Sequence, residues 1–249
     1  MPPLPDYPES PGIDAIRAHA LADLRVLQQF GVDGILVENE YDRPHRVLAT
    51  AATVESMRDV TMAVAEAAVD CVVGCEILLN DPKASLEVAR SCHAKFIRTD
   101  YFVDRMSRPE YGEFEIDPRG LIAYREKTGA GELLLLADIQ VKYATMLEEK
   151  SLAESAELAC RMLADAVVVT GDETGDAPSV AQLRAARDGV AASGQNIPVL
   201  IGSGLTANNA GGLLAECDGA IVGTALMCDR AVDAPATRRL MSAVRKARA

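Results

Sequence analysis

Charged and amide side chains follow several of the apolar runs in this 249-residue sequence, and these are the residues that could do chemistry. The candidates for catalytic work are Glu38, Asn39, Asp100, Asp138 and Lys142. A carboxylate beside a lysine in a partly desolvated site can exchange protons near neutral pH, because burial and neighbouring charges shift pKa values. A lysine can also form a Schiff base with a carbonyl substrate. Milder roles stay open, such as an ion pair for Arg98 or a solvated loop charge for Lys142.

Glycine-rich turns form a second candidate group. They follow the apolar runs near positions 166, 198 and 219, and the residues that we expect to bind phosphate there are Thr170, Gly171, Gly202, Ser203, Gly204, Gly223 and Thr224. In the last units of a (β/α)8 barrel, such turns gather backbone N–H groups and hydroxyls where helix N-termini direct positive potential. The alternative is that the glycines only make tight turns between strands and helices.

Apolar runs and helical patterns alternate along the chain, and this alternation must position the candidates. Seven expected strands lie near 32, 71, 95, 133, 166, 198 and 219, and eight expected helices near 13, 53, 82, 118, 151, 179, 206 and 234. The stretch 101–115 is expected to be a longer loop. Such alternation is typical of parallel strands joined by right-handed crossovers. We therefore expect an α/β fold, a (β/α)8 TIM-type barrel, as a single domain over residues 1–249.

The predicted barrel lacks a first strand. Residues 1–12 contain five prolines, too many for a hydrogen-bonded strand, and they precede the first helix. We expect an incomplete barrel with its gap between the strands at Ile35 and Ile221, narrowed by the N-terminal segment or by a partner chain. An open sheet edge favours pairing with another chain, so a homo-oligomer is expected.

Composition limits the classes of partner that this protein is expected to bind. The net charge of -12 disfavours nucleic acid and anionic membrane surfaces. The six cysteines form no C-x-x-C pair, the three histidines give no zinc pattern, and neither a signal peptide nor a membrane span is evident, so we expect a cytoplasmic protein. No cofactor is evident either, although clustered carboxylates could hold magnesium together with a substrate phosphate.

Several motifs together resemble one known family. They include Gly31-Val-Asp-Gly-Ile-Leu-Val-Glu-Asn39, Asn80-Asp81, Phe96-Ile-Arg98, Ala137-Asp138 with Val141-Lys142, Ala164-Asp-Ala-Val-Val-Val-Thr-Gly171 with Thr174-Gly175, Gly202-Ser-Gly204 and Ile221-Val-Gly-Thr224. Nearly the whole chain resembles the BtpA/SgcQ family in register. The resemblance implies a TIM-type barrel. One member of the family is linked to photosystem I biogenesis and others sit with sugar-uptake genes, so no single reaction is implied.

The sequence also departs from that family. Members usually begin with an additional strand, carry histidine where Tyr143 stands, and have a Gly-Val-Asn third strand where this chain has Gly74-Cys75-Glu76. Two function hypotheses follow. The first is a small-molecule enzyme that acts on a phosphorylated sugar or related metabolite by lyase, isomerase or glycosyl-transfer chemistry. The alternative is a non-catalytic assembly or stability factor for a partner protein.

Overall fold

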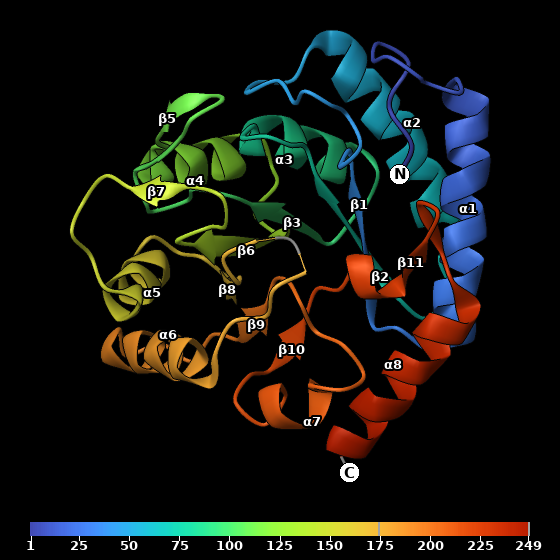
Figure 1. The fold of residues 1–249 in the computed structure, drawn as a ribbon. Helices are drawn as coiled ribbons and strands as arrows, with labels where there is room; N and C mark the ends of the chain where they lie inside the picture. The colour runs from blue at the N-terminus through green and yellow to red at the C-terminus, as the bar shows by residue number, and fades with distance from the viewer. Residues whose placement is uncertain (174, 249) are drawn as a thin grey trace. The chain divides into compact units, whose positions relative to one another are not determined.

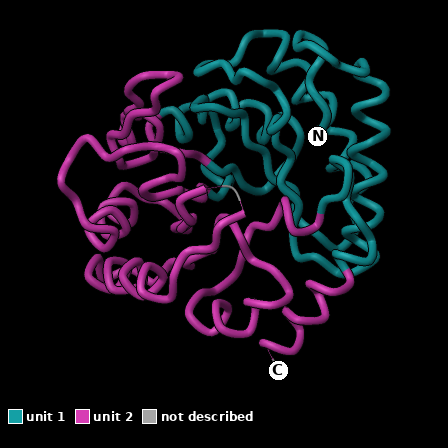
Figure 2. The backbone as a smooth tube through the Cα atoms, in the orientation of Figure 1, with its two compact units in different colours: residues 1–98, 124–134, 227–237 teal, residues 99–123, 135–226, 238–249 magenta. Residues whose placement is uncertain are grey.

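A computed structural model describes residues 1–173 and 175–248 as an α/β protein. Thr174, which belongs to one of the family-like motifs, lies outside the described residues. The chain divides into two compact units (Figure 2). Unit 1 contains Met1–Arg98, Tyr124–Leu134 and Met227–Thr237, and unit 2 contains Thr99–Ala123, Leu135–Leu226 and Arg238–Ala249. The expected single domain stays a prediction.

Parallel strands and the helices between them make up unit 1. Its strands are β1 (Gly34–Glu38), β2 (Val72–Glu76) and β3 (Phe96–Thr99, whose last residue belongs to unit 2), in that order. The helices are α1 (Ile13–Gln29), α2 (Ala51–Ala67) and α3 (Pro82–Ser91), and a short antiparallel pair, β11 (Met227–Cys228) and β12 (Ala231–Val232), packs on α1. The strand expected near 71 runs from Val72 to Glu76.

Local signals in the sequence explain where these helices begin and end. The Thr50 hydroxyl accepts the N–H of Thr53 at the start of α2, and the Asp81 carboxylate accepts the N–H of Ala84 at the start of α3. Gly31 follows α1 with a φ of 74°, a left-handed conformation that glycine adopts without strain. The helices expected near 13, 53 and 82 are thereby confirmed.

Unit 2 repeats the pattern with β6 (Leu134–Ile139), β8 (Ala166–Val169), β9 (Val199–Ile201) and β10 (Gly219–Ala220), again parallel and in that order. Helices α5 (Leu152–Arg161) and α6 (Val180–Ala192) pack side by side (Figure 1). Short helices α7 (Ala210–Leu213) and η1 (Thr224–Leu226) follow β9 and β10. Helices α4 (Pro118–Lys127) and α8 (Ala234–Ala247) have residues in both units.

The stretch 101–115 is a correction to the predicted loop. It contains β4 (Met106–Arg108) and β5 (Gly112–Phe114), which pair antiparallel, and β4 also pairs with β7 (Thr145–Met146) from the segment after β6. A three-stranded sheet in unit 2 therefore stands where we expected irregular backbone. The prediction failed because each strand is only two or three residues long and its partner is remote in the sequence.

The parallel sheet has seven strands, and among the described residues none lies in residues 1–12, as predicted from the prolines. The N-terminal segment is nevertheless ordered within unit 1. Leu4 is completely buried, and its N–H donates to the Asp42 carboxylate at 2.8 Å. The expected homo-oligomer stays a prediction. No helix in the described part of the chain is long and apolar enough to cross a membrane.

Candidate functional site

The ends of the four strands of unit 2 are in register at one edge of the sheet. Ile139 of β6 pairs with Val169 of β8, Val169 pairs with Ile201 of β9, and Ile201 pairs with Ala220 of β10. Because the strands are parallel, the segments that follow them all leave from the same edge. This register places the predicted phosphate residues and Lys142 in segments that leave the same edge of the sheet, and Lys142 contacts one of them, Thr170.

Hydrogen bonds within unit 2 join the turn after β9 to the turn after β8. The Ser203 hydroxyl accepts the N–H of Gly171 at 3.0 Å and donates to the carbonyl oxygen of Asp176 at 2.7 Å. The N–H of Gly202 donates to Val169 at 2.8 Å. Gly171, Gly202 and the Ser203 hydroxyl therefore hold the turns in place, and their donors are already used.

Other donors at this edge are open. Among the described residues, the N–H groups of Gly204 and Gly223 have no hydrogen-bond acceptor, and the hydroxyl of Thr224 has no partner. Gly223 and Thr224 are exposed, whereas Gly204 is half-buried with a φ of 71°. Gly204 must be glycine, since an added Cβ would lie 2.1 Å from the nitrogen of Ala177. Its turn thus packs closely against the backbone of Asp176 and Ala177.

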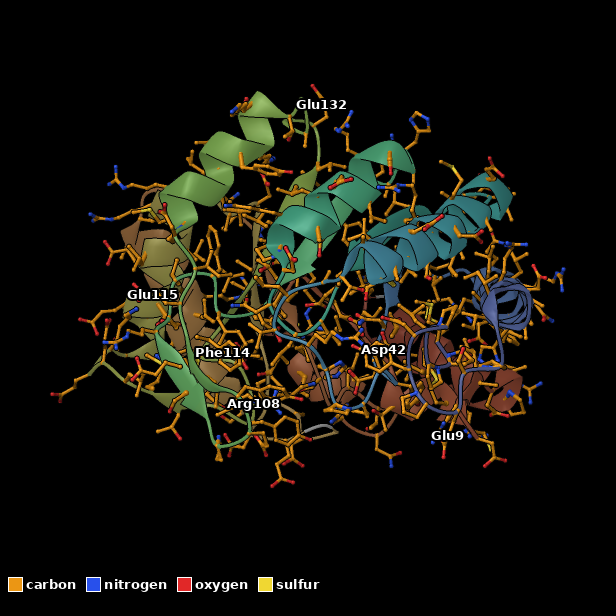
Figure 3. All side chains as sticks on the ribbon, turned by 90° about the horizontal axis from the view of Figure 1, so that it is seen from above. Glu9, Asp42, Arg108, Phe114, Glu115 and Glu132 are labelled. Carbon is orange, nitrogen blue, oxygen red and sulfur yellow. The ribbon has the colours of Figure 1, made fainter. Side chains whose placement is uncertain are left out.

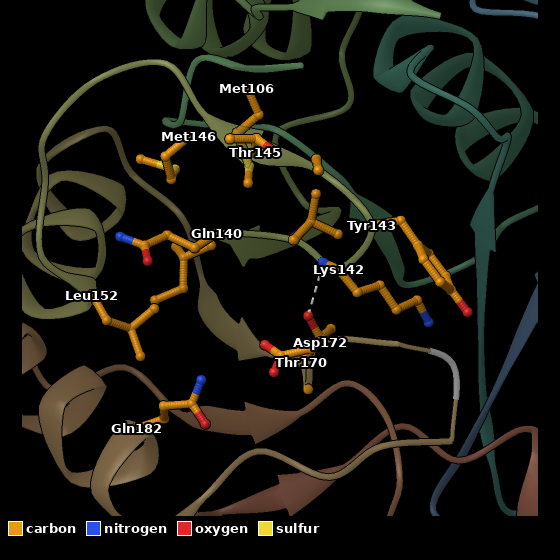
Figure 4. A pocket seen from close by; sticks show the side chains of 14 residues that line it. Met106, Gln140, Lys142, Tyr143, Thr145, Met146, Leu152, Thr170, Asp172 and Gln182 are labelled. Carbon is orange, nitrogen blue, oxygen red and sulfur yellow. Dashed lines mark hydrogen bonds between the residues drawn. The ribbon is translucent and has the colours of Figure 1, made fainter. Parts of the chain in front are cut away.

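Lys142 stands next to Thr170 across the ends of β6 and β8. Its N–H donates to the Thr170 hydroxyl at 3.2 Å, and its ammonium group pairs with no carboxylate in residues 1–173 and 175–248 (Figure 4). Both residues line a pocket of about 430 Å³. Its other walls include the apolar side chains of Met106, Met146 and Leu152 and the polar side chains of Thr145, Asp172 and Gln182. An uncompensated cation therefore lies at a pocket wall of mixed polarity.

Asp138 and Asp100 lie near a buried tyrosine. Asp138 is completely buried within β6, and Asp100 is half-buried directly after β3. The pKa of Tyr101 is raised by burial above all, and further by the charges of Asp100 and Asp138. These two carboxylates therefore act on one hydroxyl, which they help to keep protonated.

In unit 1, by contrast, the predicted acid–base residue Glu38 belongs to an ion-pair cluster. Glu38 and Glu76 are neighbours in register on β1 and β2, and Arg98 of β3 lies 3.3 Å from Glu38 Oε1 and 3.8 Å from Glu76 Oε2. Arg98 and Glu76 are buried. Charges removed from water need such partners. The ion pair foreseen for Arg98 is therefore present, and a chemical role for Glu38 stays a prediction.

Every polar atom of the Asn39 side chain is occupied. Its Oδ1 accepts the N–H of Leu78 at 2.8 Å, and its Nδ2 donates to the carbonyl oxygen of Leu78 at 3.3 Å and to Asp42 Oδ2 at 3.0 Å. The side chain is buried. Asn39 thus ties the ends of β1 and β2 together, and burial raises the pKa of Asp42.

Asp104 is a buried residue beside the candidate site that the sequence did not point to. Its buried carboxylate accepts the N–H of Gln140 at 2.7 Å, the Ser155 hydroxyl at 2.7 Å and the Lys150 ammonium at 2.9 Å. This network fixes the chain two residues before Lys142. The four residues lie up to 51 positions apart, so no local pattern signals them.

Within the described residues, no group of three or more His, Cys, Asp or Glu side chains is close enough to hold a metal ion.

Comparisons with known proteins identify relatives of the whole chain. The model of the BtpA family matches residues 1–246. An uncharacterized protein of Archaeoglobus fulgidus is 33% identical over 98% of this chain and 95% of its own length. The photosystem I biogenesis protein BtpA of Synechocystis is 32% identical over 86% of this chain and 73% of its own.

Solved structures with the same fold include enzymes. Thiamine phosphate pyrophosphorylase from Pyrococcus furiosus matches with a TM-score of 0.59 at 17% identity, covering 90% of this chain and 89% of that one. 3-Hexulose-6-phosphate synthase matches with a TM-score of 0.59 at 14% identity, covering 92% of this chain and 94% of that one. These likenesses confirm the predicted fold class, α/β of TIM-barrel type.

Proposed function

Since the chain belongs to the BtpA family and shares its fold with enzymes named for phosphorylated metabolites, we propose that it is an enzyme acting on a phosphorylated sugar or related small metabolite. One observation carries the proposal. The edge of unit 2 holds open backbone donors on two adjacent turns and a lysine whose ammonium pairs with no carboxylate among the described residues. Such a combination suits a phosphate group.

The phosphate would be bound by the N–H groups of Gly204 and Gly223 and by the hydroxyl of Thr224, with Lys142 as the cation. Hydrogen bonds to a charged acceptor contribute about 1.5–3 kcal/mol each in folding studies, so a few of them support useful affinity. Thr170 would position Lys142 through the bond between the Lys142 N–H and the Thr170 hydroxyl. Ser203, Gly171 and Gly202 would hold the two turns at the right spacing.

Asp138 would supply the acid–base chemistry of unit 2, with Asp100 as the neighbouring carboxylate and Lys142 as the electrostatic partner. Proton transfer by a positioned carboxylate suits lyase, isomerase and glycosyl-transfer reactions alike. An Asp138→Asn variant should lose turnover and keep its affinity for phosphate, the pattern of a group that acts in the transition state. Equal loss of both would make Asp138 a structural residue.

The phosphate site is tested by adding negative charge where it does no steric harm. An added Cβ at Gly223 meets no atom within 4 Å, so Gly223→Asp should leave the fold intact and repel phosphate. Gly212, also in unit 2, offers equally open space for a Gly212→Asp control. We expect calorimetry with inorganic phosphate to show binding by the native chain and the control only. Unchanged binding by Gly223→Asp contradicts the assignment.

A second candidate function is an assembly or stability factor for a partner protein. The printed name of the Synechocystis relative, a photosystem I biogenesis protein, favours it. This function needs no phosphate site. If the native chain binds neither inorganic phosphate nor a sugar phosphate, this second candidate replaces the first.

A further inference from the structure

Arg108 of β4 is a nearly buried cation in unit 2 that lacks a strong partner. Its guanidinium carbon lies 5.3 Å from the centre of the Tyr111 ring and 5.5 Å from that of Tyr143, and its side chain is 14% exposed. The carboxylate of Glu110 lies 3.8 Å from Nε, too far for a hydrogen bond, and is mostly in solvent. Within the described residues the buried Nε–H donates to no acceptor. A desolvated donor without an acceptor is costly, so a bound group is the natural explanation.

Tyr101 presents a second unsatisfied group beside this arginine. It is 1% exposed, it stacks on Phe114 with the ring centres 4.5 Å apart, and its hydroxyl has no well-formed hydrogen bond to any described residue. Arg108 lowers the pKa of this hydroxyl through a weak side-chain hydrogen bond and then through its charge, so the two groups are neighbours. Tyr101 also has a φ of 52°, which is rare for a bulky side chain. Backbone strain of this kind is retained where the surroundings fix a residue for a purpose.

Both groups belong to the same part of unit 2. Figure 3 shows Arg108 and Phe114 on the hairpin of β4 and β5, and Phe114 is the ring on which Tyr101 stacks. Tyr143, the second ring beside Arg108, directly follows Lys142 in the chain, so their Cα atoms are about 3.8 Å apart. Arg108 therefore contacts the ring of the residue that follows Lys142, the cation that we assign to phosphate.

We propose that Arg108 and Tyr101 bind a carboxylate group of the substrate, which makes the substrate a phosphorylated carboxylic acid. This inference rests on the proposed function, because it names the second polar group of a ligand whose phosphate lies near Lys142. The Nε edge of a guanidinium is a planar fork that matches the two oxygens of a carboxylate, and Tyr101 adds a third donor. Asp100 and Asp138 lie nearby, and they oppose a singly charged carboxylate less than a second phosphate.

The test compares two ligands that differ in one group. 3-Phosphoglycerate carries a phosphate and a carboxylate, whereas glycerol 3-phosphate carries only the phosphate. We expect calorimetry to show that the native chain binds 3-phosphoglycerate about tenfold more tightly, since hydrogen bonds to a charged group are worth about a factor of ten or more. Arg108→Met should abolish this preference and leave glycerol 3-phosphate unchanged. Tyr101→Phe should reduce the preference about threefold, as a single lost hydrogen bond would.

Glu110→Gln is the matched control. It removes the carboxylate nearest to Arg108 and leaves the fork intact, so 3-phosphoglycerate should bind as tightly as to the native chain or more tightly. Equal affinity of the native chain for the two ligands, or an Arg108→Met variant that keeps the preference, overturns the proposal.

A third ligand keeps this inference separate from the proposed function. If glycerol 3-phosphate does not bind, the phosphate site fails, and glycolate then probes the carboxylate subsite alone. The readout is the NMR signal of the Arg108 Nε–H, identified by its absence in Arg108→Met. A saturable shift of that signal with glycolate supports the subsite, and an unmoved signal overturns it.

Discussion

Polar groups follow the strands in both units, but they have partners in unit 1 and several of them are open in unit 2. In unit 1, Glu38 and Glu76 share Arg98, and the amide of Asn39 binds Leu78 and Asp42. At the carboxyl ends of the strands in unit 2, the ammonium of Lys142 and the N–H groups of Gly204 and Gly223 have no partner among the described residues. Polar groups at the strand ends are thus paired within unit 1, whereas several of those in unit 2 are open.

This difference separates polar residues that stabilise the fold from those that are candidates for binding. A buried group with good partners lowers the free energy of its own unit, and removing it costs stability. An open donor or cation adds little to stability, so it is a candidate for binding. Substitutions in unit 1 should therefore change the free energy of unfolding, and those in unit 2 the affinity for anions.

The largest effect is expected for Arg98→Met. The substitution leaves the buried carboxylate of Glu76 without this partner and should lower the free energy of unfolding by about 3 kcal/mol. Urea denaturation measures the loss. Arg184, whose pair with Glu216 lies at the surface, provides the control, and Arg184→Met should cost less than about 1 kcal/mol. Similar losses for both variants would remove the contrast between the units.

Asn39→Ala should have the next largest effect. Three hydrogen bonds disappear, and the partly buried backbone groups of Leu78 lose this partner, so we expect a loss of about 2 kcal/mol in the free energy of unfolding. The folded variant should bind inorganic phosphate as the native chain does. A stable variant with weakened phosphate affinity would give Asn39 a direct role instead of a positional one.

Lys142→Met tests the unit 2 half of the comparison, in which affinity changes and stability does not. Loss of the uncompensated ammonium should weaken phosphate binding about tenfold, which corresponds to about 1.4 kcal/mol. Stability should stay within about 0.5 kcal/mol, because the ammonium has no partner among the described residues. Calorimetry measures the phosphate affinity, and urea denaturation of the same preparation measures the stability. A marked loss of stability without any change in affinity would place Lys142 with the structural residues.

The smallest effect concerns the pH dependence of unit 1. Burial raises the pKa of Asp42 above its ordinary value of 3.8, so the folded state holds this proton more tightly than the unfolded state. The stabilising contribution is present below pH 3.8 and is lost as the pH rises through the folded pKa. Relative to the native chain, Asp42→Asn should therefore gain stability as the pH rises above 3.8. A difference in unfolding free energy that is independent of pH would contradict this assignment.

Most of the framework could be predicted from the sequence. Apolar periodicity placed the seven strands of the parallel sheet and the eight α-helices of the described residues, because this signal acts over a few residues. The missing strand in residues 1–12 followed from the prolines. The sheet of β4, β5 and β7 could not be predicted, since its strands are short and β7 is remote from the hairpin in sequence.

The partners of individual side chains were harder to predict. Nothing in the sequence distinguishes Asn39, whose amide is fully used, from Lys142, whose ammonium is open, because long-range contacts decide both. Ser203 and Gly171 show the same limit, since each satisfies the other across 32 positions. The position of Arg108 beside the ring of Tyr143 could not be predicted either, because only the tertiary structure brings these two residues together.

The contrast between the units is tested most directly by a crystal structure of the protein with inorganic phosphate bound. We predict phosphate density within hydrogen-bond distance of the N–H groups of Gly204 and Gly223, on the side of Lys142. Phosphate density on Arg98 in unit 1, or no density at the unit 2 turns at a concentration that saturates binding in calorimetry, would contradict the account.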